Sequence, residues 1–380
     1  MISTLPKVIL HEHIEGSVTP ELAAILAQKH GVTLPSDFLY PEGQYDKSDF
    51  PNGRYQYDES DFGAFVTAYD VVADLVRDAD DYYLVMKDYL TRNAEQGLVY
   101  CEMITSAFHM CHDPKTNSLN AKQYHAFMDG ILRAMDEVKA KYGTETRLHA
   151  CSVRHLSLEE FTISADFVAA EPRPEVTGFN IAGNEMAGEF ADFEYAHKLV
   201  AQIPLQKSYH AGEIRGPESI RDALACGAKR IGHGIAAIKD PALIQTLIDE
   251  QITLEVAPSS NRILVTEFEQ SLEKHPLRRL YDAGVRLSIN TDDAGLFGTD
   301  VAKEYRLAQQ VFGFNRVELL DVTLCALEAA FVEDEIKQSL IANVYTQFNQ
   351  QDWQDLELHC QQLPDGALKQ RLQSRLKEKK

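Results

Sequence analysis

Four short segments of the 380-residue chain combine histidine and carboxylate side chains, and these are the residues best suited to chemistry. They are His11-Glu12-His13, His210-Ala211-Gly212-Glu213, Gly232-His233-Gly234 and Asn290-Thr291-Asp292-Asp293. Each segment alone has an ordinary explanation, such as a loop histidine or an aspartate that caps a helix. Because histidine nitrogen and carboxylate oxygen are typical zinc ligands, the four segments together favour a metal centre that activates water.

The first segment offers two imidazoles on one side of the backbone, because residues i and i+2 of an extended chain point the same way. His11 and His13 can therefore reach one ion, and adding His210 and Asp292 gives a reasonable zinc set with room for a water molecule. The remaining residues have types that suit proton transfer and substrate anchoring: Glu213, His233 and Asp293. This chemistry predicts a metal-activated hydrolase of an uncharged or weakly charged substrate.

The elements that position these segments follow a regular alternation. Eight runs are typical of β-strands, at 8–10, 98–101, 148–153, 176–181, 208–210, 230–233, 252–256 and 285–289. Helical stretches separate most of them, and strands joined in this way pair in parallel because each crossover needs about a dozen residues or more. Eight such units predict a (β/α)₈ barrel of the TIM type, in the α/β class, with its chemistry at the C-terminal strand ends.

Two regions exceed a minimal barrel. Residues 33–60 are rich in Pro, Gly, Asp and Tyr and precede a helical stretch, so we interpret 33–75 as an inserted lid. Helical patterns continue after Asp292, and we expect 349–380 to form a C-terminal helical tail. Since no repeat, linker or low-complexity block occurs, residues 1–380 are interpreted as one domain.

The charge balance excludes several kinds of partner. The chain carries 37 Lys and Arg against 58 Asp and Glu, a formal net charge of −21, which argues against a nucleic acid polymer or an anionic membrane. Six cysteines occur without a CxxC pair, no apolar run approaches about 18 residues, and no secretory signal pattern is present. We therefore expect a reduced, cytoplasmic protein, and the oligomeric state stays open.

Six ordered segments make the chain resemble a known family, over about Leu5 to Phe348. They read LPKV with HEHIEGS (5–8 and 11–17), NIAGNE (180–185), HAGE (210–213), RIGHG (230–234), EVAPSSN (255–261) and SINTDD (288–293). In this combination the chain is similar to the adenosine deaminases and their relatives, the adenosine/AMP-type deaminases of the amidohydrolase superfamily.

The resemblance implies one zinc ion per chain, held by His11, His13, His210 and Asp292. It implies that Glu213 donates a proton to purine N1 and that His233 orients, or deprotonates, the attacking water. Zinc lowers the pKa of a bound water to about 7, and attack on C6 then releases ammonia.

The resemblance also implies the substrate contacts. Asp293 would hydrogen-bond N7, and the backbone of Gly183 would meet N3. Phe62, Phe65 and Val66 match an apolar lid helix that excludes water, although an ordinary buried helix face explains them equally well. The expected partner is a small purine nucleoside or base.

Departures from the family pattern bear on the substrate. Glu15 stands where adenosine deaminases usually carry an Asp that meets the ribose 5′-hydroxyl, and it occurs in relatives that act on adenine or other 6-aminopurines. The family pattern also differs at Asn180, Asn184, Ala257 and Ala294. The stretches Ile181-Ala182-Gly183 and RIGHG resemble the adenosine branch, so the sequence favours adenosine or 2′-deoxyadenosine, converted to inosine or 2′-deoxyinosine.

Alternatives stay open at this point. The same chemistry could act on adenine, 6-aminodeoxyfutalosine or an N6-substituted adenine. A different class, barrel hydrolases of esters, lactones or phosphotriesters, often holds two metals bridged by a modified lysine, and no lysine ends the strand near Gly183. A catalytically inactive binding protein would be expected to carry broken ligands, which this sequence does not.

Overall fold

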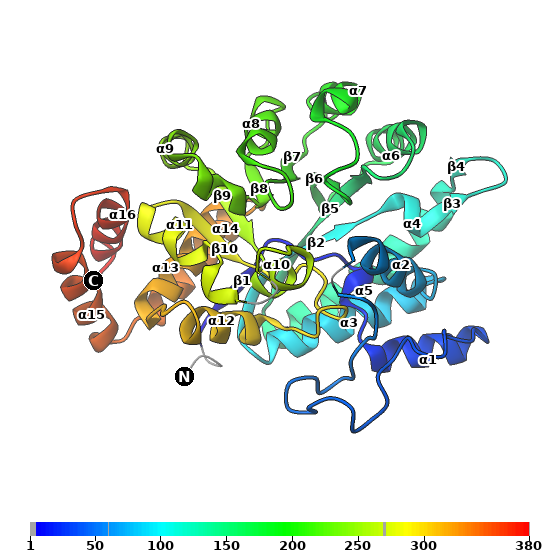
Figure 1. Cartoon of the computed structure of the whole chain (residues 1–380), viewed down its shortest axis with the longest axis horizontal. Helices are drawn as coiled ribbons and strands as arrows, with labels where there is room; N and C mark the ends of the chain where they lie inside the picture. Colours follow the sequence, from blue (N-terminus) through cyan, green and yellow to red (C-terminus); the bar gives the residue numbers. More distant parts are fainter. Residues whose placement is uncertain (1–4, 60, 269–270, 380) are drawn as a thin grey trace.

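Eight parallel strands form the centre of the structure, a computed structural model that describes residues 5–59, 61–268 and 271–379. In sheet order they are β1 (Lys7–Ile9), β2 (Leu98–Thr105), β5 (Glu145–Val153), β6 (Val176–Ala182), β7 (Gln206–Ala211), β8 (Arg230–His233), β9 (Thr253–Val256) and β10 (Arg286–Ile289). Every neighbouring pair is parallel. All eight predicted strand runs are present, and the α/β barrel is confirmed (Figure 1).

Helices on the outside carry the chain from each strand to the next. They include α3 (Ala79–Ala94), α5 (Ala121–Tyr142), α6 (Leu158–Ala170), α7 (Glu194–Val200), α8 (Pro217–Ala225), α9 (Pro241–Asp249) and α11 (Leu277–Ala283). Local chemistry sets their ends: the Asp78 side chain accepts from the amides of Asp80 and Asp81 at the start of α3. Gly143, with φ 77°, ends α5 in the left-handed conformation.

The barrel closes between β10 and β1 through the residues that follow these strands. The Leu10 amide donates to Asn290 Oδ1 at 2.8 Å, and the Asp292 amide donates to the His11 carbonyl at 3.0 Å. The His13 amide then donates to the Asp292 carbonyl at 2.7 Å. Closure of the barrel therefore brings the first and last of the candidate site segments together.

The predicted lid region lies over one end of the barrel. It follows α1 (Pro20–His30) as a run of turns with one isolated bridge between Leu39 and Tyr55, and it ends in α2 (Phe62–Ala73). The Phe65 ring of α2 stacks on Phe297 with 5.3 Å between ring centroids. Ser60, which belongs to the predicted lid, lies outside the described residues.

Two short elements between β2 and α5 were not predicted. They are α4 (Ala107–Cys111) and a hairpin of β3 (His112–Asp113) and β4 (Ser118–Leu119), which projects from the barrel in Figure 1. Their strands are only two residues long, too short for a periodic sequence signal.

The C-terminal helices pack against the barrel beside β1 and β10. They are α12 (Val301–Gln310), α13 (Arg316–Ala329), α14 (Asp334–Thr346), α15 (Gln350–Gln362) and α16 (Ala367–Leu376). The predicted tail contains α15 and α16, which lie together at one side of the molecule (Figure 1), and its last residue, Lys380, is not described. Arg371 and Arg375 of α16 each donate to Asp321 of α13 at 3.0 Å, so the tail is fixed to a buried helix.

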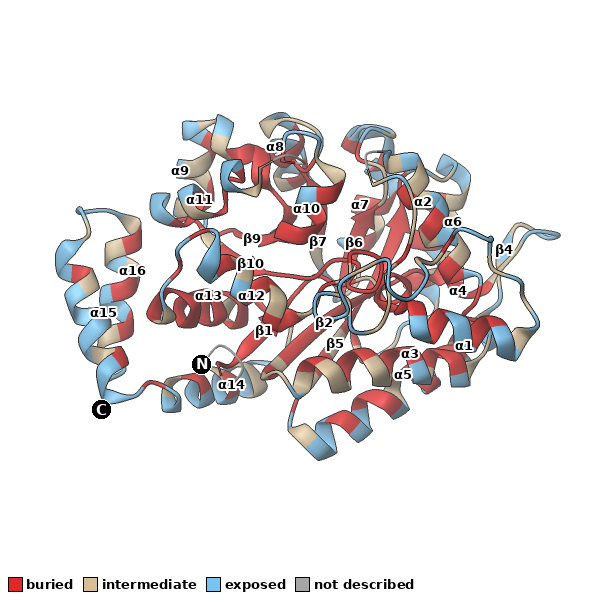
Figure 2. Ribbon diagram, turned by 60° about the horizontal axis from the view of Figure 1, so that its bottom comes forward, coloured by how far each residue is buried: buried red, intermediate tan, exposed pale blue. Residues whose placement is uncertain are grey.

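The strands are buried almost throughout, whereas α15 and α16 expose one side to solvent (Figure 2). Burial on both faces is typical of parallel strands that are covered by helices. Among the described residues, no helix combines the length and the apolarity that a membrane crossing requires.

Candidate active site

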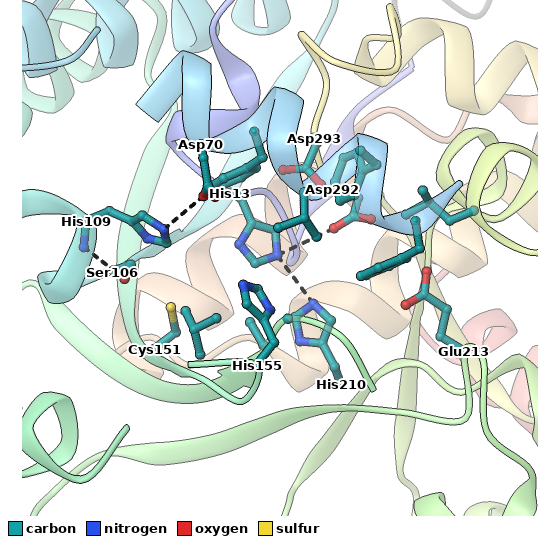
Figure 3. A pocket seen from close by; sticks show the side chains of 18 of the residues that line it. His13, Asp70, Ser106, His109, Cys151, His155, His210, Glu213, Asp292 and Asp293 are labelled. Atoms are coloured by element: carbon teal, nitrogen blue, oxygen red, sulfur yellow. Dashed lines mark hydrogen bonds and ion pairs between the residues drawn. The ribbon is translucent and has the colours of Figure 1, made fainter. Parts of the chain in front are cut away.

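A cavity lies at the C-terminal ends of the strands and collects most of the residues that the sequence singled out. Its lining includes His13, Phe62, Phe65, Val66, Gly183, His210, Glu213, His233, Asp292 and Asp293. Glu213 lies on one side of this cavity and His109 on the opposite side, with His13, His155 and His210 between them (Figure 3). His11 is completely buried behind the lining, and Glu15 also lies outside it.

Strained backbone places two of these side chains. His233 ends β8 with φ 60°, and Asp292 follows β10 with φ 65°. A left-handed conformation is uncommon for residues other than glycine and costs of order 1–3 kcal/mol. The barrel holds both residues in this conformation at the point where their side chains meet.

The donor atoms of His11, His210, His233 and Asp292 all lie within 4.8 Å of one another. His13 lies at the edge of this cluster, with its Nε2 3.3 Å from His210 Nε2 and 3.5 Å from Asp292 Oδ1 (Figure 3). The structure thus brings the four predicted ligands together and adds His233, which was expected to act beside the metal.

The positions of the imidazole ring protons fit a cation at the centre of this cluster. His11 Nδ1 lies 2.8 Å from Glu255 Oε2, and His210 Nδ1 lies 2.8 Å from Asn180 Oδ1. Each contact places the ring proton on Nδ1 and leaves an Nε2 lone pair pointing into the cluster. The buried His11 Nε2 has no hydrogen-bond donor and lies 3.2 Å from Asp292 Oδ1, so two electron-rich atoms face each other. A metal ion satisfies both.

The electrostatics agree with this interpretation. Burial lowers the pKa of His13 to about 3 and that of His233 to about 4, so both imidazoles are neutral at pH 7. Burial also opposes a charge on His11, yet Asp292 and Glu255 raise its pKa to about 10. The two carboxylates therefore attract positive charge strongly at this point.

Glu213 has the environment of a carboxylic acid. Its Oε1 lies 3.5 Å from Asn261 Nδ2 and 3.7 Å from His233 Nδ1. Burial, followed by the nearby Asp292 and Glu185 carboxylates, holds the pKa of Glu213 well above its usual range. A raised pKa favours the protonated carboxyl group, which can donate its proton to a bound ligand.

Asn261 connects Glu213 and His233 to His275, and no role was predicted for it. Its Nδ2 lies 3.2 Å from His233 Nδ1, and its Oδ1 lies 3.1 Å from His275 Nε2. Asn261 belongs to α10 (Pro258–Leu264), in the same EVAPSSN segment that carries the family resemblance. The segment pointed to a functional region, but it could not show that Asn261 contacts Glu213, His233 and His275.

Asp293 and Gly183 present polar groups to the cavity. The Asp293 Oδ1 atom is buried without a hydrogen-bond partner, and burial together with the Asp292 charge raises the pKa of Asp293 well above its usual range. Gly183 has φ 90°, and a Cβ there would lie 2.5 Å from His155 Nδ1. Only glycine lets the backbone approach the cavity at this position.

Glu15 is held away from the cavity. Its carboxylate accepts from the Tyr69 hydroxyl at 3.0 Å and from the Tyr82 hydroxyl at 3.2 Å, and its exposed fraction is 1%. Burial raises its pKa. Tyr69 lines the cavity and Glu15 does not, so the tyrosine stands between the carboxylate and the cavity.

The far side of the cavity was not predicted from the sequence. It is formed by Asp70, Ser106, His109, Cys151 and His155. Ser106 follows β2 and Cys151 lies near the end of β5. Because both lie at C-terminal strand ends, the sequence could have predicted that they line the cavity. Among the described lining residues there is no lysine or arginine.

Known proteins are similar to this chain in both sequence and fold. The family model described as adenosine deaminase matches residues 6–347. An adenine deaminase from Sinorhizobium medicae is 39% identical over 346 residues, which is 91% of this chain and 100% of that protein.

Solved structures agree in fold. The adenine deaminase from Arthrobacter aurescens superimposes with a TM-score of 0.78 at 25% identity, covering 90% of this chain and 98% of that one. An amidohydrolase from Burkholderia ambifaria with bound Zn superimposes with a TM-score of 0.75 at 22% identity, covering 91% of each chain.

Proposed function

Because the chain belongs to the adenosine deaminase family, whose members hydrolyse a C–N bond of a cyclic amidine, we propose that its substrate is adenine. Water would replace the 6-amino group, giving hypoxanthine and ammonia. This choice differs from the sequence-based preference for adenosine and takes up one of its alternatives. The adenine deaminases at 37–39% identity support it.

The position of Glu15 is the observation that carries the proposal. A carboxylate that recognises the ribose 5′-hydroxyl must reach the cavity, and Glu15 instead accepts two tyrosine hydroxyls behind the lining. Tyr69 fills the space in front of it. A free base needs no such contact, because it has no ribose.

The charge of the cavity argues further against nucleotides. A phosphate group is normally bound by arginine, lysine or converging backbone amides. The described lining has neither cationic residue, and its four acidic side chains, Asp70, Glu213, Asp292 and Asp293, supply no positive charge. A neutral purine fits this lining better than AMP does.

We assign one zinc ion per chain to His11, His13, His210 and Asp292. A metal ion of this kind lowers the pKa of a water molecule that it binds to about 7. His233, whose Nε2 lies 4.0 Å from Asp292 Oδ2, would orient this water or accept its proton.

Protein groups would supply the protons for the purine. Glu213 would donate to N1, which makes C6 more electrophilic, and its burial keeps the proton in place until then. Protonated Asp293 would donate to N7 through the Oδ1 that has no partner in the protein, and the Gly183 backbone would meet N3. The water oxygen would add to C6, the proton taken by His233 would pass to the amino group, which leaves as ammonia, and the remaining hydroxyl proton would return to Glu213 as the 6-oxo group forms.

Steady-state assays with the purified protein test the substrate. The panel is adenine, N6-methyladenine, adenosine, 2′-deoxyadenosine, 6-aminodeoxyfutalosine and AMP, followed by absorbance change and ammonia release. We expect kcat/KM for adenine to exceed that for adenosine by about 100-fold or more. Equal or faster turnover of adenosine would contradict the proposal, and two metal ions per chain would favour the ester and lactone hydrolases instead.

A further inference from the structure

The Glu185 carboxylate is buried, with an exposed fraction of 1%, and receives five hydrogen bonds from the segment after β7. Oε1 accepts from the Gly212 amide at 2.5 Å and from Ser219 Oγ at 2.6 Å. Oε2 accepts from the amides of Glu213, Ile214 and Arg215 at 3.0, 2.7 and 2.9 Å. Four consecutive amides thus meet on one side chain.

These amides have no partners in a strand or helix, because β7 ends at Ala211 and α8 begins at Pro217. Gly212 turns the chain with φ 67°, and the amides that follow it form a concave anion site of the kind called a nest. A buried amide without a partner costs about 1–3 kcal/mol, so this loop conformation depends on an acceptor at its centre. Although burial opposes ionisation, Ser219 and the amides hold the pKa of Glu185 below its usual value.

Glu185 also belongs to the loop that carries Gly183, two residues earlier. Under the proposed function, Glu213 and Gly183 face N1 and N3, which are atoms of the same six-membered ring. We propose that Glu185 is a positioning residue for deamination, which fixes Glu213 at the distance from Gly183 that this ring requires. The role of Glu185 at the purine ring rests on the proposed function. The fixing of the loop after β7 by Glu185 does not depend on the substrate.

A second contact joins the same two loops at the surface and provides a matched control. Arg215 Nη2 donates to Glu189 Oε1 at 2.7 Å, and Glu189 is exposed. Exposed ion pairs contribute little, about 0–1 kcal/mol. Removing this contact should leave the loop after β7 in place, whereas removing the Glu185 acceptor should not.

A double-mutant cycle tests the proposal. Glu185→Gln keeps the size of the side chain but turns a donor toward two or three of the five groups that donate to Glu185, and we expect kcat to fall roughly 10- to 100-fold. If Glu185 acts through Glu213, the same substitution should have almost no further effect on the residual kcat of Glu213→Gln. Glu189→Gln should keep kcat within about twofold of the wild type.

Equal loss of kcat in both backgrounds would overturn the proposal, as would normal activity of Glu185→Gln. If that variant does not fold, Ser219→Ala removes one of the five bonds and should show a smaller loss with the same dependence on Glu213.

Amide hydrogen exchange supplies a measurement that needs no activity. Glu185→Gln should speed exchange at residues 212–215 and leave the other strand-end loops unchanged, whereas Glu189→Gln should not. Unchanged exchange at 212–215 would overturn the positioning role by itself. Absence of turnover by the wild-type protein would instead count against the proposed function, and exchange would still decide the structural claim.

Discussion

Glu255 Oε2 lies 2.8 Å from His11 Nδ1, and both side chains are completely buried. The other oxygen, Oε1, accepts from Arg230 Nε at 2.6 Å and from Ser208 Oγ at 2.7 Å. Burial opposes ionisation of Glu255, but Arg230 and His11 lower its pKa to about 2. A charged carboxylate therefore fixes the tautomer of His11, and the His11 Nε2 atom faces the cluster of candidate metal ligands.

Glu255→Gln should weaken zinc binding roughly 10- to 100-fold, because the amide no longer fixes the proton on His11 Nδ1. Titration against a chelator of known affinity measures this directly. Asp321→Asn, which also removes a buried carboxylate from arginine partners but lies away from the cavity, should bind zinc normally. An unchanged dissociation constant for Glu255→Gln would show that His11 needs no such partner.

Glu213→Gln should keep zinc and lose kcat by about 10²- to 10⁴-fold, since the amide cannot donate a proton to N1. Asp292→Ala should lose both zinc and activity, because it removes a ligand. Metal analysis and steady-state kinetics on the two variants separate the roles. A near-normal kcat for Glu213→Gln would refute its role as the acid.

Tyr69→Ala should raise the ratio of kcat/KM for adenosine to that for adenine by about 10-fold. The substitution removes both the 3.0 Å bond to Glu15 and the ring that separates Glu15 from the cavity, so the carboxylate can reach a ribose hydroxyl. Tyr57→Ala is the control, since its hydroxyl bonds the Leu296 carbonyl at 3.3 Å and not Glu15. If both variants keep the wild-type ratio, Glu15 does not govern this selection.

Asp321→Asn should destabilise the protein by about 1–3 kcal/mol at pH 7, because the half-buried Arg371 and the buried Arg375 lose the charged carboxylate between them, while Arg375 keeps its pair with Glu328. Burial opposes ionisation, yet Arg371 and Arg375 hold the pKa of Asp321 below its usual value. The stabilisation is therefore present above the unfolded-state pKa of about 3.9 and is lost as the pH falls.

Melting temperatures across pH check this dependence. The difference between wild type and Asp321→Asn should be large at pH 7 and should shrink below about pH 4. Lys369→Ala breaks the pair with Asp365, whose side chain is exposed, and should change the melting temperature little. A constant difference at all pH values would exclude the ion pairs as its source.

The sequence was most informative where the relevant residues are contiguous. Each barrel strand is a short contiguous run of the sequence, and candidate site residues such as His210 and Glu213 lie at its end or directly after it. Helix α6 gives a weaker sequence pattern, since its apolar residues do not mark one clear face, although Ser157 and Glu160 form a capping box at its start. Helix α7 has only seven residues, which is too short for a periodic pattern.

The sequence by itself determined the alternation of strands and helices, which predicts the barrel. It also determined which histidine and carboxylate residues follow the strands, and so the set of candidate metal ligands. It did not determine which distant side chains meet. Tyr69 and Tyr82 lie 54 and 67 positions after Glu15, and Gly212 lies 27 positions after Glu185. Such pairs form only when the barrel closes, because burial then forces each carboxylate to find donors among whatever side chains and amides lie beside it. The tertiary structure therefore decided that Glu15 faces two tyrosine hydroxyls and does not line the cavity.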